Sequence, residues 1–222
     1  MNSWTFETPE IAAGFDDHIR EQLPWYDMVT DAVVYIARNY IPTKGCVITE
    51  IGASTGNMTK ALLPTFSERH GYHYQAVEES KAMCGVFTEN VTHPLVTLFD
   101  EDILDINMDG FDTSHVTILF LTLMFIPTEE RESLIKALRS NSYKGGCIIV
   151  VDKVLDHGGY FGTVLKRLGM HFKLMQGAKP EDVLNKEMSL AGVQIPIDPA
   201  ILGADAKEFF RMGEFVGWVI ET

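Results

Sequence analysis

Short β-branched and apolar runs alternate with segments of helical periodicity through the middle of the chain. Strands are predicted over residues 46–51, 72–77, 95–99, 116–121 and 147–151, and helices over 57–66, 80–90 and 129–141. The run at 116–121 is almost wholly apolar, which is typical of a strand buried on both faces of a parallel sheet. Strands that alternate with helices predict an α/β fold with a doubly wound, mostly parallel sheet.

Two segments flank this alternating region. The N-terminal one is rich in aromatic residues and shows a helical pattern at Met28, Ala32, Tyr35, Ile36 and Tyr40. After Asp152 the alternation stops, and glycines punctuate a largely helical region that precedes a last apolar stretch at 215–220. We expect a single domain over 1–222, with an N-terminal helical cap at 1–45, a ligand-binding core at 46–152, a helical cover at 153–213 and the last strand at 214–222.

Composition narrows the classes of partner. The 222 residues include 31 acidic and 18 basic ones, for a net charge of −13, which argues against a nucleic-acid partner. The longest apolar run, 116–126, is shorter than the roughly 20 residues of a membrane-spanning helix, and the first residues lack a signal-peptide pattern. Three scattered cysteines predict no disulfide framework and no thiolate metal site. We therefore expect a cytoplasmic protein without a membrane span or a bound metal.

A glycine loop follows the first predicted strand, in the sequence Glu50-Ile51-Gly52-Ala53-Ser54-Thr55-Gly56. The glycines permit a tight turn and a close approach of the backbone to a ligand, and the following helix presents free N–H groups. Such loops also serve as plain connections between a strand and a helix. A ligand site needs support from the neighbouring strand ends.

Acidic residues at two further strand ends supply this support. Glu78 lies 22 residues beyond Gly56, where a carboxylate accepts hydrogen bonds from both ribose hydroxyls of a nucleoside. Asp102 follows the third strand, and with Ile103 it could bind the amino edge and the face of an adenine. Each acid alone is also compatible with a solvated strand end. Together with the loop they predict a nucleoside pocket across three consecutive strand ends.

The loop also discriminates between nucleoside cofactors. Its middle position is Ser54 instead of the glycine of a dinucleotide fingerprint, and Glu50 precedes the first glycine by two residues. A carboxylate there repels a pyrophosphate but suits a cationic amino acid tail. The pattern resembles motif I of class I S-adenosylmethionine-dependent methyltransferases. This resemblance implies a Rossmann-like fold and S-adenosylmethionine as the cofactor, with Gly52, Ala53, Ser54 and Gly56 at the ligand, Glu78 at the ribose and Asp102 with Ile103 at the adenine.

The resemblance extends beyond the superfamily. Trp4-Thr5-Phe6, Phe15-Asp16-Asp17 and Leu23-Pro24-Trp25-Tyr26 look like the cap of the carboxy-S-adenosylmethionine synthases of tRNA wobble-uridine modification. This implies that Tyr26 contacts the amino acid end of the cofactor, and that the protein is a homodimer.

Two departures from that family bear on the reaction. The chain has Phe120 where the family has an asparagine beside the cofactor, and Glu187 falls near the arginine that clamps the extra carboxylate. A glutamate repels a carboxylate instead of pairing with it. These departures favour plain methyl transfer over synthesis of a carboxylated cofactor.

The leading hypothesis is therefore a transferase, a methyltransferase acting on a small-molecule acceptor beneath the cover. Transfer from a sulfonium depends mainly on positioning, so no nucleophile motif is required. Tyr26, Glu187 and His157 are the candidates for a catalytic base. Two alternatives remain at this level: a carboxy-S-adenosylmethionine synthase-like enzyme, and a non-catalytic acidic binding protein.

Overall fold

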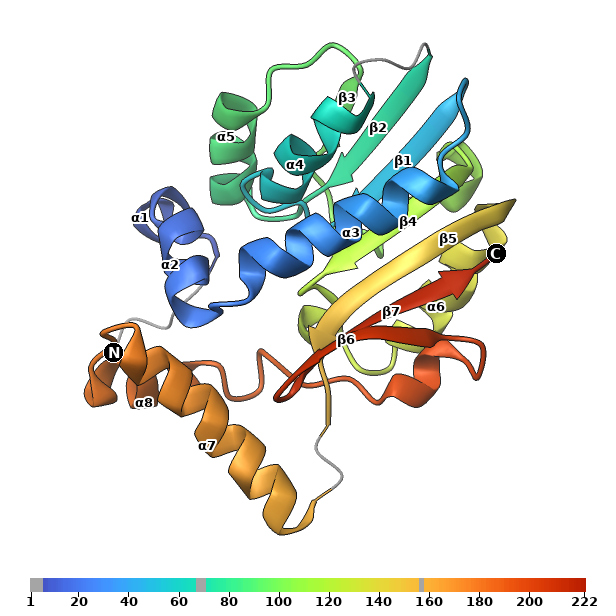
Figure 1. The fold of residues 1–222 in the computed structure, drawn as a ribbon. Coiled ribbons are helices and arrows are strands. Elements are labelled where there is room, and N and C mark those ends of the chain that lie inside the picture. Colours follow the sequence, from blue (N-terminus) through green and yellow to red (C-terminus); the bar gives the residue numbers. More distant parts are fainter. Residues whose placement is uncertain (1–5, 67–70, 156–157) are drawn as a thin grey trace.

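The computed structural model describes residues 6–66, 71–155 and 158–222, and Figure 1 shows how their helices and strands are arranged. The elements in chain order are α1 (Pro9–Ala13), α2 (Phe15–Gln22), α3 (Tyr26–Tyr40), β1 (Cys46–Ile51), α4 (Asn57–Phe66), β2 (Tyr72–Val77), α5 (Lys81–Asn90), β3 (Val96–Phe99), β4 (Ser114–Phe120), α6 (Arg131–Ser140), β5 (Ser142–Lys153), α7 (Gly159–Met175), α8 (Pro180–Ser189), β6 (Lys207–Met212) and β7 (Phe215–Glu221), with short 3₁₀ turns at Met108–Gly110, Leu123–Phe125 and Pro199–Leu202. None of the helices within these ranges is both long and apolar enough to cross a membrane.

Seven strands form one sheet in the order β3-β2-β1-β4-β5-β7-β6. β1 to β5 are mutually parallel, whereas β7 runs antiparallel to β5 and β6 antiparallel to β7. The predicted doubly wound, mostly parallel sheet is confirmed. Strand order reverses at β1, which lies between β2 and β4, and ligands of such sheets bind beyond the carboxyl ends of the strands at this point.

Helices cover both faces of the sheet. One core cluster joins the sheet to α3, α4 and α5, and a second joins the opposite face to α6 and to the 3₁₀ turn at 199–202. Central strand β4 contributes Val116 and Ile118 to the first cluster and Leu119 to the second, all with no exposed surface. This burial on both faces explains the apolar run at 116–121 in the sequence.

Helix α3 forms as predicted, but it buries a different face. Val29, Val33 and Ala37 are fully buried against the sheet, whereas Met28 is 59% and Tyr35 65% exposed. Both sets of residues recur at helical spacing, so periodicity alone does not choose between them. The smaller side chains face inward because they let the helix pack close to the sheet.

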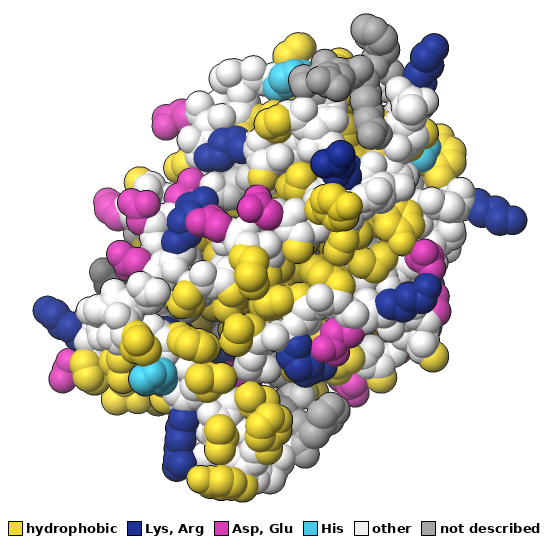
Figure 2. Space-filling view, viewed as in Figure 1, with side chains coloured by type: hydrophobic (Ala, Val, Ile, Leu, Met, Phe, Trp, Pro, Cys, Tyr) yellow, Lys and Arg dark blue, Asp and Glu magenta, His cyan; other side chains and the backbone are white. Residues whose placement is uncertain are grey.

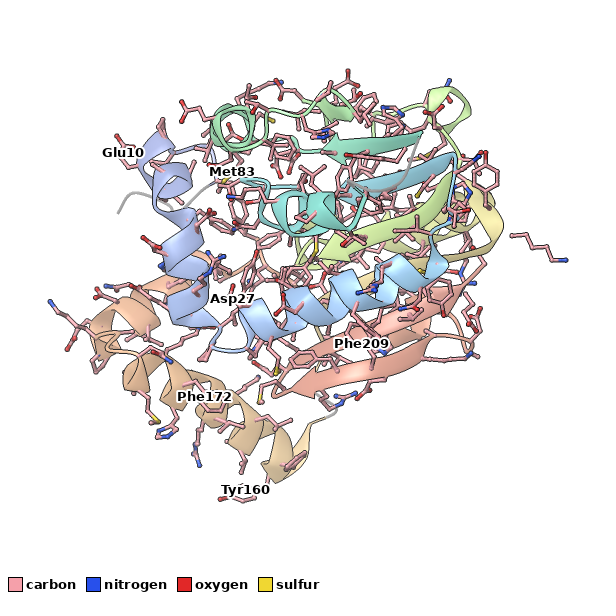
Figure 3. All side chains as sticks on the ribbon, turned by 45° about the horizontal axis from the view of Figure 1, so that its top comes forward. Glu10, Asp27, Met83, Tyr160, Phe172 and Phe209 are labelled. Carbon is pink, nitrogen blue, oxygen red and sulfur yellow. The ribbon has the colours of Figure 1, made fainter. Side chains whose placement is uncertain are left out.

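The N-terminal helices and the predicted cover lie at the sheet edge where the parallel strands end (Figure 1). α7 and α8 form the cover, and Figure 2 shows hydrophobic side chains gathered over this part of the surface. The expected extent of the cover to residue 213 is wrong, because residues 207–212 form the edge strand β6. Phe209, labelled in Figure 3, is followed directly by Phe210, and the register of β6 shifts at this point. The irregularity removes the strict alternation by which a strand is recognised in a sequence.

Candidate active site

A cavity of about 1000 Å³ lies beyond the carboxyl ends of β1, β2 and β4. Its walls come from the N-terminal helices, the loop after β1, the segments after β2, β3 and β4, and the cover. Ligand pockets usually measure about 300–1,000 Å³, so this cavity stands at the upper end of that range. It has room for a nucleoside cofactor together with a second small molecule.

The loop after β1 forms the floor of the cavity. Gly52 has a φ of +73°, and its N–H and that of Ala53 both donate to the Val77 carbonyl at 2.9 Å, which ties the end of β1 to β2. A Cβ atom on Gly52 would stand 2.5 Å from Oγ1 of Thr122, whose hydroxyl donates to the Ile51 carbonyl. Both the backbone conformation and the close approach of β4 therefore require glycine here.

The second glycine of the loop has another role. Gly56 has a φ of +85°, and a Cβ there would stand 2.6 Å from Cγ2 of Val91. Gly56 was expected to contact the cofactor. The described cavity lining contains Gly52, Ala53 and Ser54 but does not include Gly56. Its glycine serves the packing of the loop against the end of α5.

Glu78 holds the loop in place. Its Oε2 accepts from the Ser54 N–H at 2.7 Å and its Oε1 from the Ser80 N–H at 2.9 Å. Burial raises the pKa of this carboxyl, although the two backbone hydrogen bonds oppose the rise. Each carboxylate oxygen keeps a further acceptor site, so Glu78 can accept from ribose hydroxyls in the cavity while it orients the loop.

The segment after β3 brings the third predicted pair to the same cavity. Asp102 and Ile103 both line it, and Asp102 Oδ1 accepts from the Leu104 N–H at 2.9 Å. Ile103 is buried and presents an apolar surface beside the carboxylate. The structure therefore brings together the loop, Glu78, Asp102 and Ile103, which are widely separated in the sequence.

Glu50 is the most deeply placed acid of the site. It is 3% exposed and accepts at Oε2 from the Thr59 hydroxyl at 2.5 Å and from the Tyr74 hydroxyl at 2.6 Å. Burial raises its pKa to about 7, with the nearby Glu78 contributing in the same direction and the two hydrogen bonds opposing. A cationic group that enters the cavity would favour the ionised form.

Tyr26 and Phe120 form an aromatic part of the cavity wall. Their rings meet edge to face, with centroids 5.4 Å apart, and both side chains are buried and line the cavity. Burial raises the pKa of Tyr26 well above its ordinary value, despite a hydrogen bond to Asn57. The phenol therefore stays protonated at neutral pH, which makes it a hydrogen-bonding group and a poor general base.

The other two candidates for a catalytic base are Glu187 and His157. Glu187 lines the cavity from α8 and pairs with Lys173 at 2.8 Å. Burial is the largest influence on the pKa of Glu187 and would raise it, but the hydrogen bond from Lys173 and the positive charges of the nearby lysines together outweigh burial, and the pKa is lowered. His157 lies outside the described residues. Across the described part of the chain, no group of three or more His, Cys, Asp or Glu side chains is placed to hold a metal ion.

One contact that closes the site was not predicted from the sequence. Asp16 on α2 accepts from the Thr55 hydroxyl and, at 2.8 Å, from the Asn57 side-chain amide, and Lys60 lies 3.6 Å away. This carboxylate fastens the N-terminal helices to the glycine loop. Phe6 extends the closure, since its ring packs edge to face on Phe125 at 5.0 Å.

No protein-family model matches the chain. Curated relatives do: a carboxy-S-adenosyl-L-methionine synthase of Staphylococcus epidermidis is 28% identical over 194 residues, covering 87% of this chain and 82% of the relative. The synthase of Marinobacter nauticus is 29% identical over 196 residues, covering 84% and 74%.

Solved structures show the same fold at low identity. An O-methyltransferase family protein from Burkholderia thailandensis has a TM-score of 0.64 at 12% identity, covering 95% of this chain and 60% of that protein. Human N-acetylserotonin methyltransferase, solved with S-adenosylmethionine, has a TM-score of 0.57 at 13% identity, covering 98% and 58%.

Fold and sequence similarity together define the class: the protein is an enzyme with the fold of the class I S-adenosylmethionine-dependent methyltransferases. The predictions of an enzyme class and of its cofactor are confirmed at this level. Within the superfamily, the chain is similar in sequence to the carboxy-S-adenosylmethionine synthases.

Proposed function

We propose that the chain binds S-adenosylmethionine in the cavity and transfers its methyl group to a small-molecule acceptor. The observation that carries the proposal is the convergence of Glu50, Glu78 and Asp102 with the glycine loop around one cavity. In the proposed arrangement, Glu78 receives the ribose hydroxyls, Asp102 and Ile103 receive the adenine, and the loop backbone lies under the sulfonium. Glu50 faces the cationic amino group, with Tyr26 and Phe120 beside the amino acid tail.

The acceptor is proposed to lie under α7 and α8. This end of the cavity includes Met170, Leu190 and Phe215, so an apolar body can be desolvated there. In the reaction, an acceptor lone pair attacks the methyl carbon, the carbon–sulfur bond breaks and its electron pair goes to sulfur. The acceptor proton leaves to a base or to solvent. Positioning supplies most of the catalysis in such an in-line displacement.

A second function has its own support. The curated relatives are carboxy-S-adenosylmethionine synthases, and the similarity covers more than four fifths of this chain. Against it stands Glu187, which falls in the segment of the family's carboxylate-binding arginine and is ionised in its pair with Lys173. We therefore rank methyl transfer first and synthesis of the carboxylated cofactor second.

Two measurements test the proposal. Isothermal titration of the purified protein should give saturable binding of S-adenosylmethionine and S-adenosylhomocysteine, and a Gly52→Arg variant should bind neither. Methyl-labelled S-adenosylmethionine should then transfer label to a small-molecule fraction of the source extract. Absence of cofactor binding by a folded wild-type protein would overturn the proposal. Formation of a carboxylated cofactor, without transfer of label, would select the second function.

A further inference from the structure

The turn that follows β4, residues 121–126, connects the two parts of the cavity. At the cofactor end, the Thr122 hydroxyl donates to the Ile51 carbonyl. At the acceptor end, the Met124 carbonyl accepts from the Ile195 N–H at 2.8 Å, and the neighbours of Ile195 in the segment after α8 line the cavity. A shift of this turn would therefore move one part of the cavity relative to the other.

The turn begins with an unfavourable backbone conformation. Leu121 has a φ of +59°, in the left-handed region that a leucine rarely adopts. Its N–H donates to the Val151 carbonyl at 2.7 Å, and its side chain lines the cavity. Strain of this kind persists only where the surrounding structure imposes it. Other residues must therefore hold the turn.

Asp152, near the end of β5, accepts from the N–H groups of the turn. Its Oδ2 accepts from the Thr122 N–H at 3.1 Å and from the Met124 N–H at 3.3 Å, and its Oδ1 accepts from the Lys153 N–H at 2.8 Å. The carboxyl is fully buried, which raises its pKa to about 7 although the backbone hydrogen bonds oppose the rise. A buried acid is costly, so its presence behind the cavity wall points to a role beyond packing.

Arg131, the first residue of α6, donates to the carbonyl groups of the same turn. Its Nε donates to the Ile126 carbonyl at 2.8 Å, and one terminal nitrogen donates to the Met124 carbonyl at 3.3 Å. The other terminal nitrogen donates to the Pro196 carbonyl at 3.2 Å, in the segment after α8. The side chain is buried, and its planar guanidinium joins the turn to this segment in a geometry that a lysine does not reproduce.

The glycine loop has supports of its own. Glu78 holds it through the Ser54 N–H, and two further N–H groups of the loop donate to the Val77 carbonyl. The segment after α8, by contrast, is bonded to the turn at Met124 and to Arg131 at Pro196. Loosening the turn should therefore displace the acceptor's side of the cavity and leave the cofactor's side in place.

We infer that Asp152 and Arg131 are positioning residues, which hold the turn 121–126 so that the acceptor lies in line with the methyl–sulfur bond of the cofactor. This inference rests on the proposed methyl transfer and deepens it. Neither side chain belongs to the described lining of the cavity, so each acts through the backbone of the turn. A misplacement of about 1 Å can slow such a reaction about 100-fold.

Two variants of the full-length protein test the positioning role. Asp152→Asn replaces one acceptor oxygen by an NH₂ group, and Arg131→Lys keeps the charge but loses the fork of donors. At saturating methyl-labelled S-adenosylmethionine, both should label the small-molecule fraction at least about tenfold more slowly than wild type. Their dissociation constants for S-adenosylhomocysteine should stay within about threefold of the wild-type value, because the glycine loop is supported separately. Asp31→Asn and Arg38→Lys, at exposed positions on α3, are matched controls and should change neither quantity.

Hydrogen exchange provides a readout that needs no acceptor. With S-adenosylhomocysteine bound, residues 121–126 and 193–197 should exchange their amide hydrogens at least about tenfold faster in both variants, while residues 52–56 exchange as in wild type. The double variant should lose less transfer rate than the product of the two single losses, because both side chains act through one turn.

The outcomes separate the two levels of the proposal. A wild type that binds no S-adenosylhomocysteine, or transfers no label, would overturn the proposed function, and hydrogen exchange would still decide whether the two side chains hold the turn. Folded variants with wild-type transfer rates would overturn the positioning role alone. A loss of S-adenosylhomocysteine affinity as large as the loss of rate would also overturn it, because the turn would then act on the cofactor. If Asp152→Asn does not fold, Arg131→Lys decides the same question.

Discussion

Replacing Glu50 by glutamine should stabilise the ligand-free protein. The carboxyl is buried, and its pKa is raised from an ordinary 4.5 to about 7, mainly by that burial. At about 1.36 kcal/mol for each pKa unit, keeping the group ionised in the folded protein costs about 3 kcal/mol. Glutamine has no charge and keeps an acceptor oxygen for the Thr59 and Tyr74 hydroxyls.

The sign of the pH dependence follows from proton binding. Between pH 4.5 and 7 the folded protein holds the Glu50 proton more tightly than the unfolded chain does. The free energy of unfolding therefore falls as pH rises through this window. From pH 5 to pH 8 the wild type should lose about 2–3 kcal/mol that Glu50→Gln retains. Asp152, whose pKa burial also raises to about 7, acts in the same direction in both proteins and cancels in the comparison.

Urea unfolding of both proteins at pH 5, 6, 7 and 8, followed by tryptophan fluorescence, measures this difference. The same variant should bind S-adenosylmethionine at least about tenfold more weakly, because it lacks the carboxylate proposed to face the cationic amino group. An equal pH slope in the two proteins would refute the reasoning about burial. A changed slope with undiminished cofactor affinity would refute the contact with the amino group.

Three further changes test other parts of the site. Glu78→Gln should weaken S-adenosylhomocysteine binding at least about tenfold by calorimetry. Glu89→Gln, a change at an exposed position on α5, is the control and should leave the affinity unchanged. Equal losses of affinity in the two variants would contradict a contact between Glu78 and the ribose. Gly52→Ala should lower the free energy of unfolding by more than about 1 kcal/mol, because Gly52 has a φ of +73° and the new Cβ would clash with Thr122. An unchanged midpoint of urea unfolding would contradict this reasoning. Asp16→Ala should speed dissociation of S-adenosylhomocysteine several-fold in stopped-flow fluorescence, because it removes the hydrogen bonds between α2 and the glycine-loop segment. An unaltered dissociation rate would show that α2 does not limit release of the ligand.

Local sequence signals predicted much of the fold. Residues 46–51 and 72–77 are strands over the predicted ranges, because β-branched residues and the flanking glycines encode their ends locally. Ser80 caps α5 through a hydrogen bond from the Met83 N–H, which fixes the start of that helix equally locally. Helices and strands whose ends are encoded by neighbouring residues could therefore be predicted from the sequence alone.

Other features depend on contacts between distant segments. The buried face of α3 is chosen by its packing on the sheet, and β6 carries a register shift that hides its alternation. Asp16 meets Thr55 across 39 residues of sequence. Asp152 and Arg131 reach the turn after β4 from two separate elements and form no local pattern, so their contacts exist only in the folded protein.

Mass spectrometry of small molecules released from the purified, denatured protein tests the central claim most directly. Occupancy by S-adenosylmethionine or S-adenosylhomocysteine is the result we predict, and it would direct the search to small-molecule methyl acceptors. Recovery of the carboxylated cofactor, heavier than S-adenosylmethionine by a carboxyl group, would contradict methyl transfer and select the activity of the curated relatives.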